Sequence, residues 1–255
     1  MGIDSNLDEE QEIQEVQYSF PYHYIPETDY ETQFSQTKHW SWGYQYLGGI
    51  LIVLDQLEKL KFDSIIDVGC GDGRFLHELN KQYPEVNKLG IDYSQRAIDM
   101  ANAMNPDITY SCLDITSENV DKKSKIVSLI EVLEHIPPTE LEEFIEETVS
   151  LVSEDGYVII TVPHENKSVQ KKHYQHFNRE KLTHLLDRHF RTLEFIPFDQ
   201  QSRILNYVQN LLGGRGSHYI ITNETIKSVF WTIYTSHYLY TSESDCGRIA
   251  VVAKK

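Results

Sequence analysis

The sequence predicts a three-layer α/β/α fold around a doubly wound, mostly parallel sheet of seven strands with an antiparallel last strand. Short β-branched runs alternate with amphipathic helical segments through the middle of the chain, as in right-handed βαβ crossovers. A glycine-rich turn directly follows the first of these runs. The last two strand-like runs are separated by an aromatic insertion, which favours an antiparallel pair at the edge of the sheet.

Each element has its own local signal. Apolar residues at helical spacing, and the capping residues Ser94 and Asn178, mark the helices. We expect a glycine turn at Gly156, between the fourth helix and the fifth strand. The expected helices cover residues 40–61, 74–82, 95–104, 139–152, 179–188 and 223–239, and the expected strands cover residues 64–68, 88–92, 108–112, 125–130, 157–162, 191–197 and 248–253.

These elements divide the chain into four parts. A polar, acidic and flexible tail is expected over residues 1–17, and an aromatic, helical N-terminal cap over residues 18–61. The predicted core spans residues 62–197 plus 247–255, and residues 198–246 form a predicted C-terminal lid or acceptor-binding insertion. The aromatic side chains of the cap and insertion suit the wall of an acceptor pocket, a homodimer interface, or packing of the cap onto the sheet.

Composition excludes several classes of protein. The chain has 39 acidic and 23 basic side chains, a net charge of −16 that repels a polyanion, so a nucleic acid is disfavoured as a partner. Its three cysteines form no CxxC pair, and no apolar run approaches the ~20 residues of a membrane span. The acidic N-terminus does not resemble a signal peptide. We therefore expect a reduced, cytoplasmic protein without a transmembrane segment.

The turn after the first strand reads Asp67-Val-Gly-Cys-Gly-Asp-Gly73. Its glycines allow a sharp bend and a close approach to a ligand, but no lysine is present to meet a terminal phosphate. Carboxylates at Asp67 and Asp72 would repel a diphosphate and accept an ammonium group. This chemistry fits the amino-acid half of S-adenosylmethionine.

Two further acids end later strands. Asp92 ends the second strand, where an acid commonly binds ribose hydroxyls. Asp114 follows the third strand and is placed to accept a hydrogen bond from an adenine amine, while Tyr93 or Leu113 could pack on the adenine ring. The ordered set of glycine turn and strand-end acids is a stronger signal than the glycine turn alone.

With these motifs the chain resembles the class I, Rossmann-like S-adenosylmethionine-dependent methyltransferases. The motifs match residues 65–73, 90–94, 112–115 and 129–137 in order, and the resemblance covers residues 62–197 and the final strand. The resemblance implies that the cofactor amino acid lies at the glycine turn, the ribose at Asp92 and the adenine near Asp114. The cofactor-binding residues that it implies are Asp67, Gly69, Cys70, Gly71, Gly73, Asp92, Tyr93, Asp114, Ile115 and Glu131.

A second motif, Glu131-Val-Leu-Glu-His135, ends the fourth strand. If the segment is helical, Glu131, Glu134 and His135 share one face, and they would form either a divalent-metal site or an acid/base site. His164 and His173 follow the fifth strand and open on the same rim of the sheet. The candidate catalytic residues are therefore His135, His173, Glu131 and His164. Alternatively, Glu131 and His135 orient the cofactor without a metal.

Two subfamilies share the Glu-x-x-Glu-His element, the quinone-precursor O-methyltransferases and the small-RNA 3′-terminal 2′-O-methyltransferases. Both resemblances imply Mg²⁺ or Mn²⁺, bound here by Glu131, Glu134, His135 and His173. The run from Tyr174 to Glu180 departs from the RNA family's motif.

We therefore expect O-methylation of a small-molecule hydroxyl on a sugar, glycoconjugate or natural product. The first alternative is metal-assisted methylation of a quinone-like phenol or an RNA 3′-terminal ribose, and the second is cofactor binding without catalysis.

Overall fold

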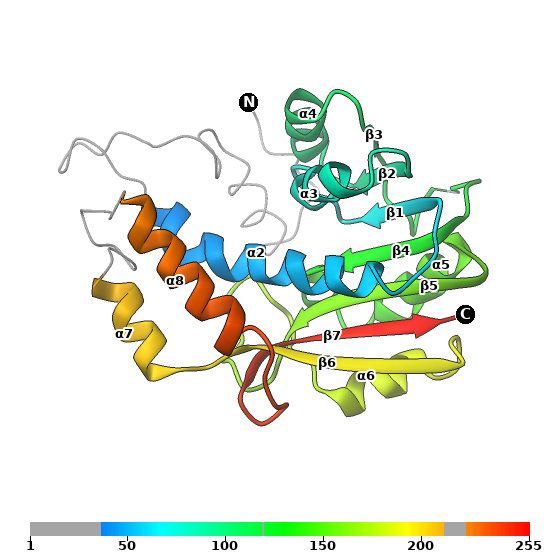
Figure 1. The fold of residues 1–255 in the computed structure, drawn as a ribbon. Helices are drawn as coiled ribbons and strands as arrows, with labels where there is room; N and C mark the ends of the chain where they lie inside the picture. Colours follow the sequence, from blue (N-terminus) through cyan, green and yellow to red (C-terminus); the bar gives the residue numbers. More distant parts are fainter. Residues whose placement is uncertain (1–36, 119, 212–222) are drawn as a thin grey trace.

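The computed structural model describes residues 37–118, 120–211 and 223–255 (Figure 1). The predicted tail, the part of the predicted cap before residue 37 and residues 212–222 of the predicted insertion lie outside these ranges. No helix within the described ranges combines the length and the apolar character that crossing a membrane requires.

A seven-stranded sheet in the order β3-β2-β1-β4-β5-β7-β6 forms the middle layer (Figure 1). Neighbouring strands among β1 to β5 pair in parallel, and β7 is antiparallel to both β5 and β6. This topology confirms the predicted fold class. The strands are β1 (Ser64–Val68), β2 (Asn87–Asp92), β3 (Thr109–Cys112), β4 (Ser124–Ile130), β5 (Val152–Pro163), β6 (Thr192–Gln200) and β7 (Cys246–Lys254).

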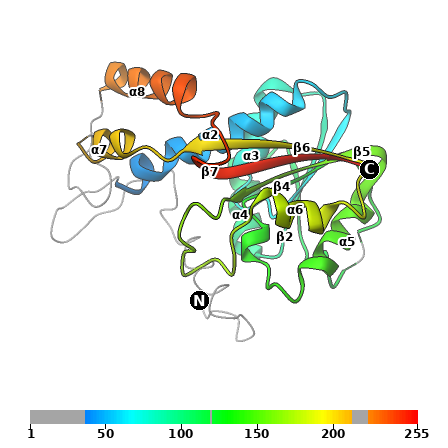
Figure 2. The same ribbon diagram turned by 90° about the horizontal axis from the view of Figure 1, so that it is seen from below.

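Helices cover both faces of the sheet (Figure 2). Alternate residues of the strands face opposite layers: Val158 and Ile160 of β5 pack with the α5 and α6 side, whereas Ile159 packs with the α2 and α3 side. The helices are α2 (Thr37–Leu57), α3 (Arg74–Gln82), α4 (Gln95–Met104), α5 (Leu141–Leu151), α6 (Arg179–Leu186), α7 (Arg203–Leu211) and α8 (Glu224–His237), with a short 3₁₀ helix, η1 (Leu133–His135).

The helix starts predicted from capping residues are confirmed. The Ser94 hydroxyl accepts a hydrogen bond from the Ala97 amide, and the Asn178 side chain accepts one from the Lys181 amide. Each bond satisfies an amide that has no partner within the first turn of its helix.

Two details differ from the sequence prediction. Gly156 does not form a turn before the fifth strand, because β5 already begins at Val152 and Gly156 lies in it where the pairing with β4 is irregular. The adjacent Asp155 has a φ of 55°, as in a β-bulge. Helix α7 was not predicted, although Ser202, whose hydroxyl accepts a hydrogen bond from the Leu205 amide, was an available start signal.

The predicted lid packs against helix α2 through aromatic rings. The ring of Tyr44 on α2 lies edge-on to Phe230 at 5.1 Å and to Tyr234 at 4.8 Å, both on α8, and all three are buried. Figure 1 shows α7 and α8 beside the first half of α2, at the end of the sheet toward which the parallel strands point. Tyr44, Phe230 and Tyr234 therefore pack α8 against α2.

Candidate functional site

The glycine turn after β1 has the backbone that its composition predicts. Gly69, Gly71 and Gly73 have φ values of 72°, 54° and 75°, a region that side chains disfavour. A Cβ at Gly69 would lie 2.5 Å from Cγ2 of Val132, so the turn is packed closely against the loop after β4. Glycine is therefore required there for both backbone conformation and space.

Asp92 fixes the shape of this turn. Its Oδ2 accepts a hydrogen bond from the Gly71 amide at 2.9 Å, and its Oδ1 accepts one from the Ser94 amide at 2.9 Å. The carboxylate is 6% exposed and thus joins the ends of β1 and β2.

A pocket opens at this rim, which we call the rim pocket. Six of the predicted cofactor-binding residues line it: Gly69, Asp92, Tyr93, Asp114, Ile115 and Glu131. The other four, Asp67, Cys70, Gly71 and Gly73, are not among its lining residues. The remaining wall comes from Val68, Ile91, Leu113, Thr116, Val132, His135, Ile136, Pro137, Glu140 and Phe144. Sequence reasoning missed Glu140 and Phe144, which come from the start of α5.

The two acids expected to meet an ammonium group face the protein interior. Oδ1 of Asp67 accepts a hydrogen bond from the Ser128 hydroxyl at 2.7 Å. Burial raises the pKa of Asp67 to about 7, and the Ser128 bond partly offsets this rise. Oδ1 of Asp72 accepts a hydrogen bond from the Arg74 amide at 3.2 Å, and burial raises the pKa of Asp72 to about 6.

Next to the rim pocket, three side chains converge in what we call the histidine cluster: Glu134, His135 and His173. One potential ligand atom from each lies within 4.8 Å of the other two. Glu134 is 1% exposed, and its Oε2 has no hydrogen-bond partner. Burial and the charge of Glu131 raise the pKa of Glu134.

The hydrogen bonds of the imidazoles assign their tautomers. Nδ1 of His135 donates to the Lys172 carbonyl at 2.8 Å, which leaves Nε2 with its lone pair. Nδ1 of His176 donates to the Lys167 carbonyl at 3.0 Å, so its Nε2 accepts from Nδ1 of His173 at 2.9 Å. His173 therefore also has an unprotonated Nε2. Backbone carbonyls commonly orient metal-binding histidines in this way.

Glu131 does not share a face with Glu134 and His135, contrary to the sequence prediction. The 3₁₀ helix η1 covers residues 133–135, whereas Glu131 precedes it with a φ of 57°. Its Oε2 accepts a hydrogen bond from Nε of Arg248 at 3.0 Å. Among the described residues, the group with metal-binding geometry thus contains Glu134, His135 and His173, but not Glu131.

His164 also lies apart from the histidine cluster. Its Nδ1 accepts a hydrogen bond from the Asn166 amide at 3.2 Å, and its Nε2 lies 3.6 Å from Oε1 of Glu243. Both His164 and Glu243 line a separate, open pocket beside α6.

Sequence reasoning missed a buried set of charges behind Glu131. A second nitrogen of Arg248, Nη1, donates to Oδ2 of Asp199 at 2.6 Å, and Asp199 is fully buried. Arg248 is a single cation directly before the apolar run from Ile249 to Ala253, which was an available signal. Asp199 had none, because its partners lie far away in sequence.

The fold, the glycine turn and the strand-end acids define a class I S-adenosylmethionine-dependent methyltransferase. Residues 44–196 match the family described as "Methyltransferase domain", which is more than half of the chain, and the chain belongs to that family. Solved structures with this fold include methyltransferases in complex with S-adenosylhomocysteine.

Similar proteins of known structure share this fold. N-methyltransferase NodS from Bradyrhizobium japonicum WM9, in complex with S-adenosylhomocysteine, is 12% identical with a TM-score of 0.63, covering 97% of this chain and 99% of that chain. A SAM-dependent methyltransferase from Archaeoglobus fulgidus is 19% identical with a TM-score of 0.55, covering 83% of this chain and 96% of that chain. At these identities the likeness shows the fold.

A viral protein is similar over a shorter stretch. Protein 235L of Invertebrate iridescent virus 6, named as a methyltransferase, is 34% identical over 74 residues. This stretch is 29% of the present chain and 28% of the viral protein.

Proposed function

We propose that the protein transfers the methyl group of S-adenosylmethionine to a hydroxyl oxygen of a small molecule. The cofactor would occupy the rim pocket, and the hydroxyl would lie at the histidine cluster. The observation that carries this proposal is that His135 belongs to the rim pocket and to the histidine cluster. It lines the pocket and is one of the three residues of the cluster. An acceptor bound by the cluster would therefore adjoin the cofactor.

The rim pocket has the groups that this cofactor needs. Asp92, Asp114 and Glu131 are carboxylates, and the ribose hydroxyls, adenine amine and ammonium group of the cofactor are hydrogen-bond donors. Tyr93 and Leu113 offer surfaces for the adenine ring. Four predicted residues of the glycine turn lie outside the pocket lining, and we propose that they maintain the shape of the turn: Asp67, Cys70, Gly71 and Gly73.

The sulfonium cofactor carries a good leaving group, so alignment of oxygen, methyl and sulfur supplies much of the acceleration. The hydroxyl must also lose its proton as it attacks, either to a side-chain base or, when a cation lowers the pKa of the hydroxyl, to solvent. Burial lowers the pKa of His135 to about 4 and of His173 to about 2. Such imidazoles are weak bases at neutral pH. Their geometry, with Nδ1 held and Nε2 free, suits ligands better.

We therefore propose that Glu134, His135 and His173 bind a divalent cation. Two imidazoles and one carboxylate favour Mn²⁺ over Mg²⁺, which prefers oxygen ligands. The unpartnered, buried Oε2 of Glu134 supports this assignment, because a buried carboxylate oxygen without a partner is costly. A bound cation supplies a Lewis acid that lowers the pKa of an acceptor hydroxyl.

The acceptor is proposed to be a sugar, a glycoconjugate or a natural product. A quinone-like phenol would use the same cation, whereas the net charge of −16 disfavours an RNA 3′ end. An amine acceptor is the competing class, since NodS is an N-methyltransferase.

Calorimetry tests the cation site without requiring the acceptor. Mn²⁺ titrated into the wild-type protein with S-adenosylhomocysteine should bind at a single site. His173→Ala should abolish this binding, while His237→Ala, an exposed histidine at the end of α8, should retain it. Equal Mn²⁺ binding by wild type and His173→Ala would contradict the cation assignment.

Transfer of a labelled methyl group tests the acceptor. Sugars, phenols and amines would be compared with and without EDTA. We expect incorporation into a hydroxyl that EDTA abolishes and Mn²⁺ restores. Methylation of amines alone would refute the hydroxyl assignment, and cofactor binding without transfer to any of them would favour a non-catalytic role.

A further inference from the structure

We infer that Asp199 and Arg248 are positioning residues through which the helices of the cap and lid control Glu131, and with it the affinity for the cofactor. We call Glu131, Arg248, Asp199, Tyr234 and Gln45 the Asp199 network. This network extends from α2 and α8 to the rim pocket. The inference concerns cofactor binding and does not depend on the identity of the acceptor.

Arg248 bridges two carboxylates. It lies on β7, between β5 and β6, opposite Pro163 and Phe198. Its Nε donates to Glu131 at 3.0 Å and its Nη1 to Asp199 at 2.6 Å. A guanidinium group can hold both partners at fixed angles, whereas an ammonium group cannot.

Asp199 connects this bridge to the helices. Its Oδ1 accepts hydrogen bonds from the Tyr234 hydroxyl on α8 at 3.3 Å and from Nε2 of Gln45 on α2 at 3.2 Å. Lys167, in the loop after β5, lies 3.6 Å from its Oδ2. The position of this one carboxylate therefore depends on α2, α8, β7 and the loop after β5.

The backbone is strained at both carboxylates of the bridge. Glu131 and Asp199 have φ values of 57° and 60°, which cost energy for residues other than glycine. Glu131 uses Oε2 for Arg248, while its Oε1 is buried without a hydrogen-bond partner, and the residue lines the rim pocket. A carboxylate held at one oxygen, with the other unpaired at a ligand pocket, suits the recognition of a donor group.

The test is a double-mutant cycle on the dissociation constant of S-adenosylhomocysteine, measured by calorimetry. Tyr234→Phe removes the hydroxyl contact with Asp199 and keeps the ring packing. We expect it to weaken binding about threefold to tenfold, as for loss of one hydrogen bond. In the Glu131→Gln background the same substitution should have no further effect, because the network then no longer reaches the ligand.

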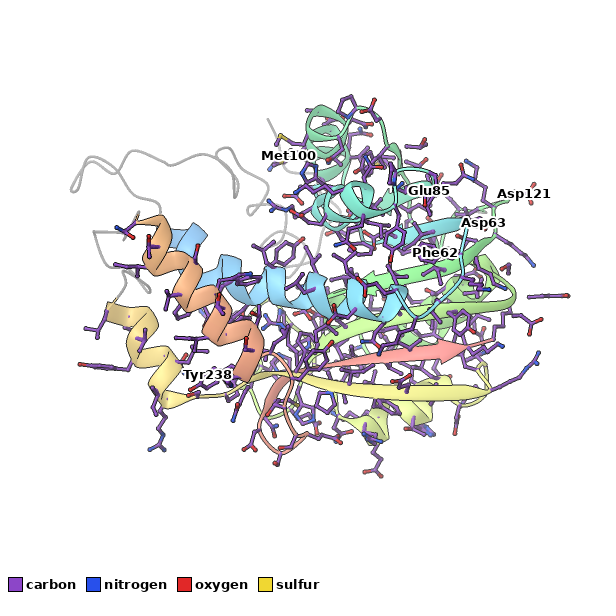
Figure 3. The ribbon with its side chains drawn as sticks, in the orientation of Figure 1. Phe62, Asp63, Glu85, Met100, Asp121 and Tyr238 are labelled. Atoms are coloured by element: carbon purple, nitrogen blue, oxygen red, sulfur yellow. The ribbon has the colours of Figure 1, made fainter. Side chains whose placement is uncertain are left out.

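Three comparisons separate positioning from general destabilisation. Tyr238→Phe, at the end of α8 and outside the network, should bind like wild type (Figure 3). Asp199→Asn is compared with Asp155→Asn as its control. Asp155 resembles Asp199 in having a positive φ and an arginine partner, Arg191, at 3.9 Å, but Asp155 is exposed. Arg248→Lys keeps the charge and should weaken binding as Tyr234→Phe does.

Unchanged binding in Tyr234→Phe, or equal effects of that substitution in the wild-type and Glu131→Gln backgrounds, would overturn the inference. A wild-type protein that does not bind S-adenosylhomocysteine would overturn both this inference and the assigned cofactor. If methyl transfer to hydroxyls fails while the effect of Tyr234→Phe still depends on Glu131, only the proposed acceptor is wrong.

Discussion

Replacing Asp67 with Asn should stabilise the cofactor-free protein at alkaline pH. Asp67 is buried in β1, next to the glycine turn, where its carboxylate accepts the Ser128 hydroxyl. An asparagine has nearly the same shape, and its Oδ1 can accept the same hydrogen bond. The substitution therefore removes a buried charge with little change in packing.

The size of the effect follows from the pKa of Asp67, which burial raises from 3.8 to about 7. Between these values the folded protein holds a proton that the unfolded chain has lost, so stability falls as pH rises. Each pH unit costs about 1.4 kcal/mol, and the whole interval roughly 4 kcal/mol. The Asp67→Asn protein does not lose stability in this way, because its side chain does not ionise. Its stability relative to wild type should rise from near zero below pH 4 to roughly 4 kcal/mol above pH 7.

Urea denaturation at several pH values between 4 and 8 measures this difference. Asp63→Asn is a matched control, because Asp63 also accepts a serine hydroxyl, from Ser64, but is exposed just before β1 (Figure 3). Its curve should run parallel to that of wild type. A difference between Asp67→Asn and wild type that does not change with pH would refute the reasoning.

Three further predictions concern the turn, a helix cap and the thiols. Gly69→Ala should weaken S-adenosylhomocysteine binding about tenfold or more, because its φ of 72° is strained for alanine and the added Cβ would meet Val132; unchanged affinity in calorimetry would contradict this. Ser94→Ala should lower the free energy of unfolding by about 1 kcal/mol, measured in urea, through loss of the bond from the Ala97 amide. Of the three thiols, Cys112 is exposed and the others are buried, so a thiol reagent should modify one cysteine rapidly in the native protein and none in Cys112→Ser.

Gly49→Ala is the control for Gly69→Ala. A Cβ at Gly49, in α2, would meet Phe198 at 3.7 Å, which is ordinary contact. It should leave cofactor affinity unchanged.

The order of elements could be read from the sequence because the signals are local. The strand 64–68 and the helix 74–82 have the predicted bounds, since the periodicity of apolar residues and the glycines between them belong to neighbouring positions. The six predicted cofactor residues that line the rim pocket could be found for a related reason. The carboxyl ends of parallel strands meet at one edge, so residues at strand ends converge.

The assignment of the two acids in Glu131-Val-Leu-Glu-His135 could not be read in this way. They are three residues apart, yet Glu134 joins His173, whereas Glu131 pairs with Arg248, 117 positions away. The sequence by itself determined that carboxylates and imidazoles gather at the end of β4. Only the tertiary structure decided which of them meet, because β7 inserts between β5 and β6 and brings Arg248 within hydrogen-bond distance of Glu131.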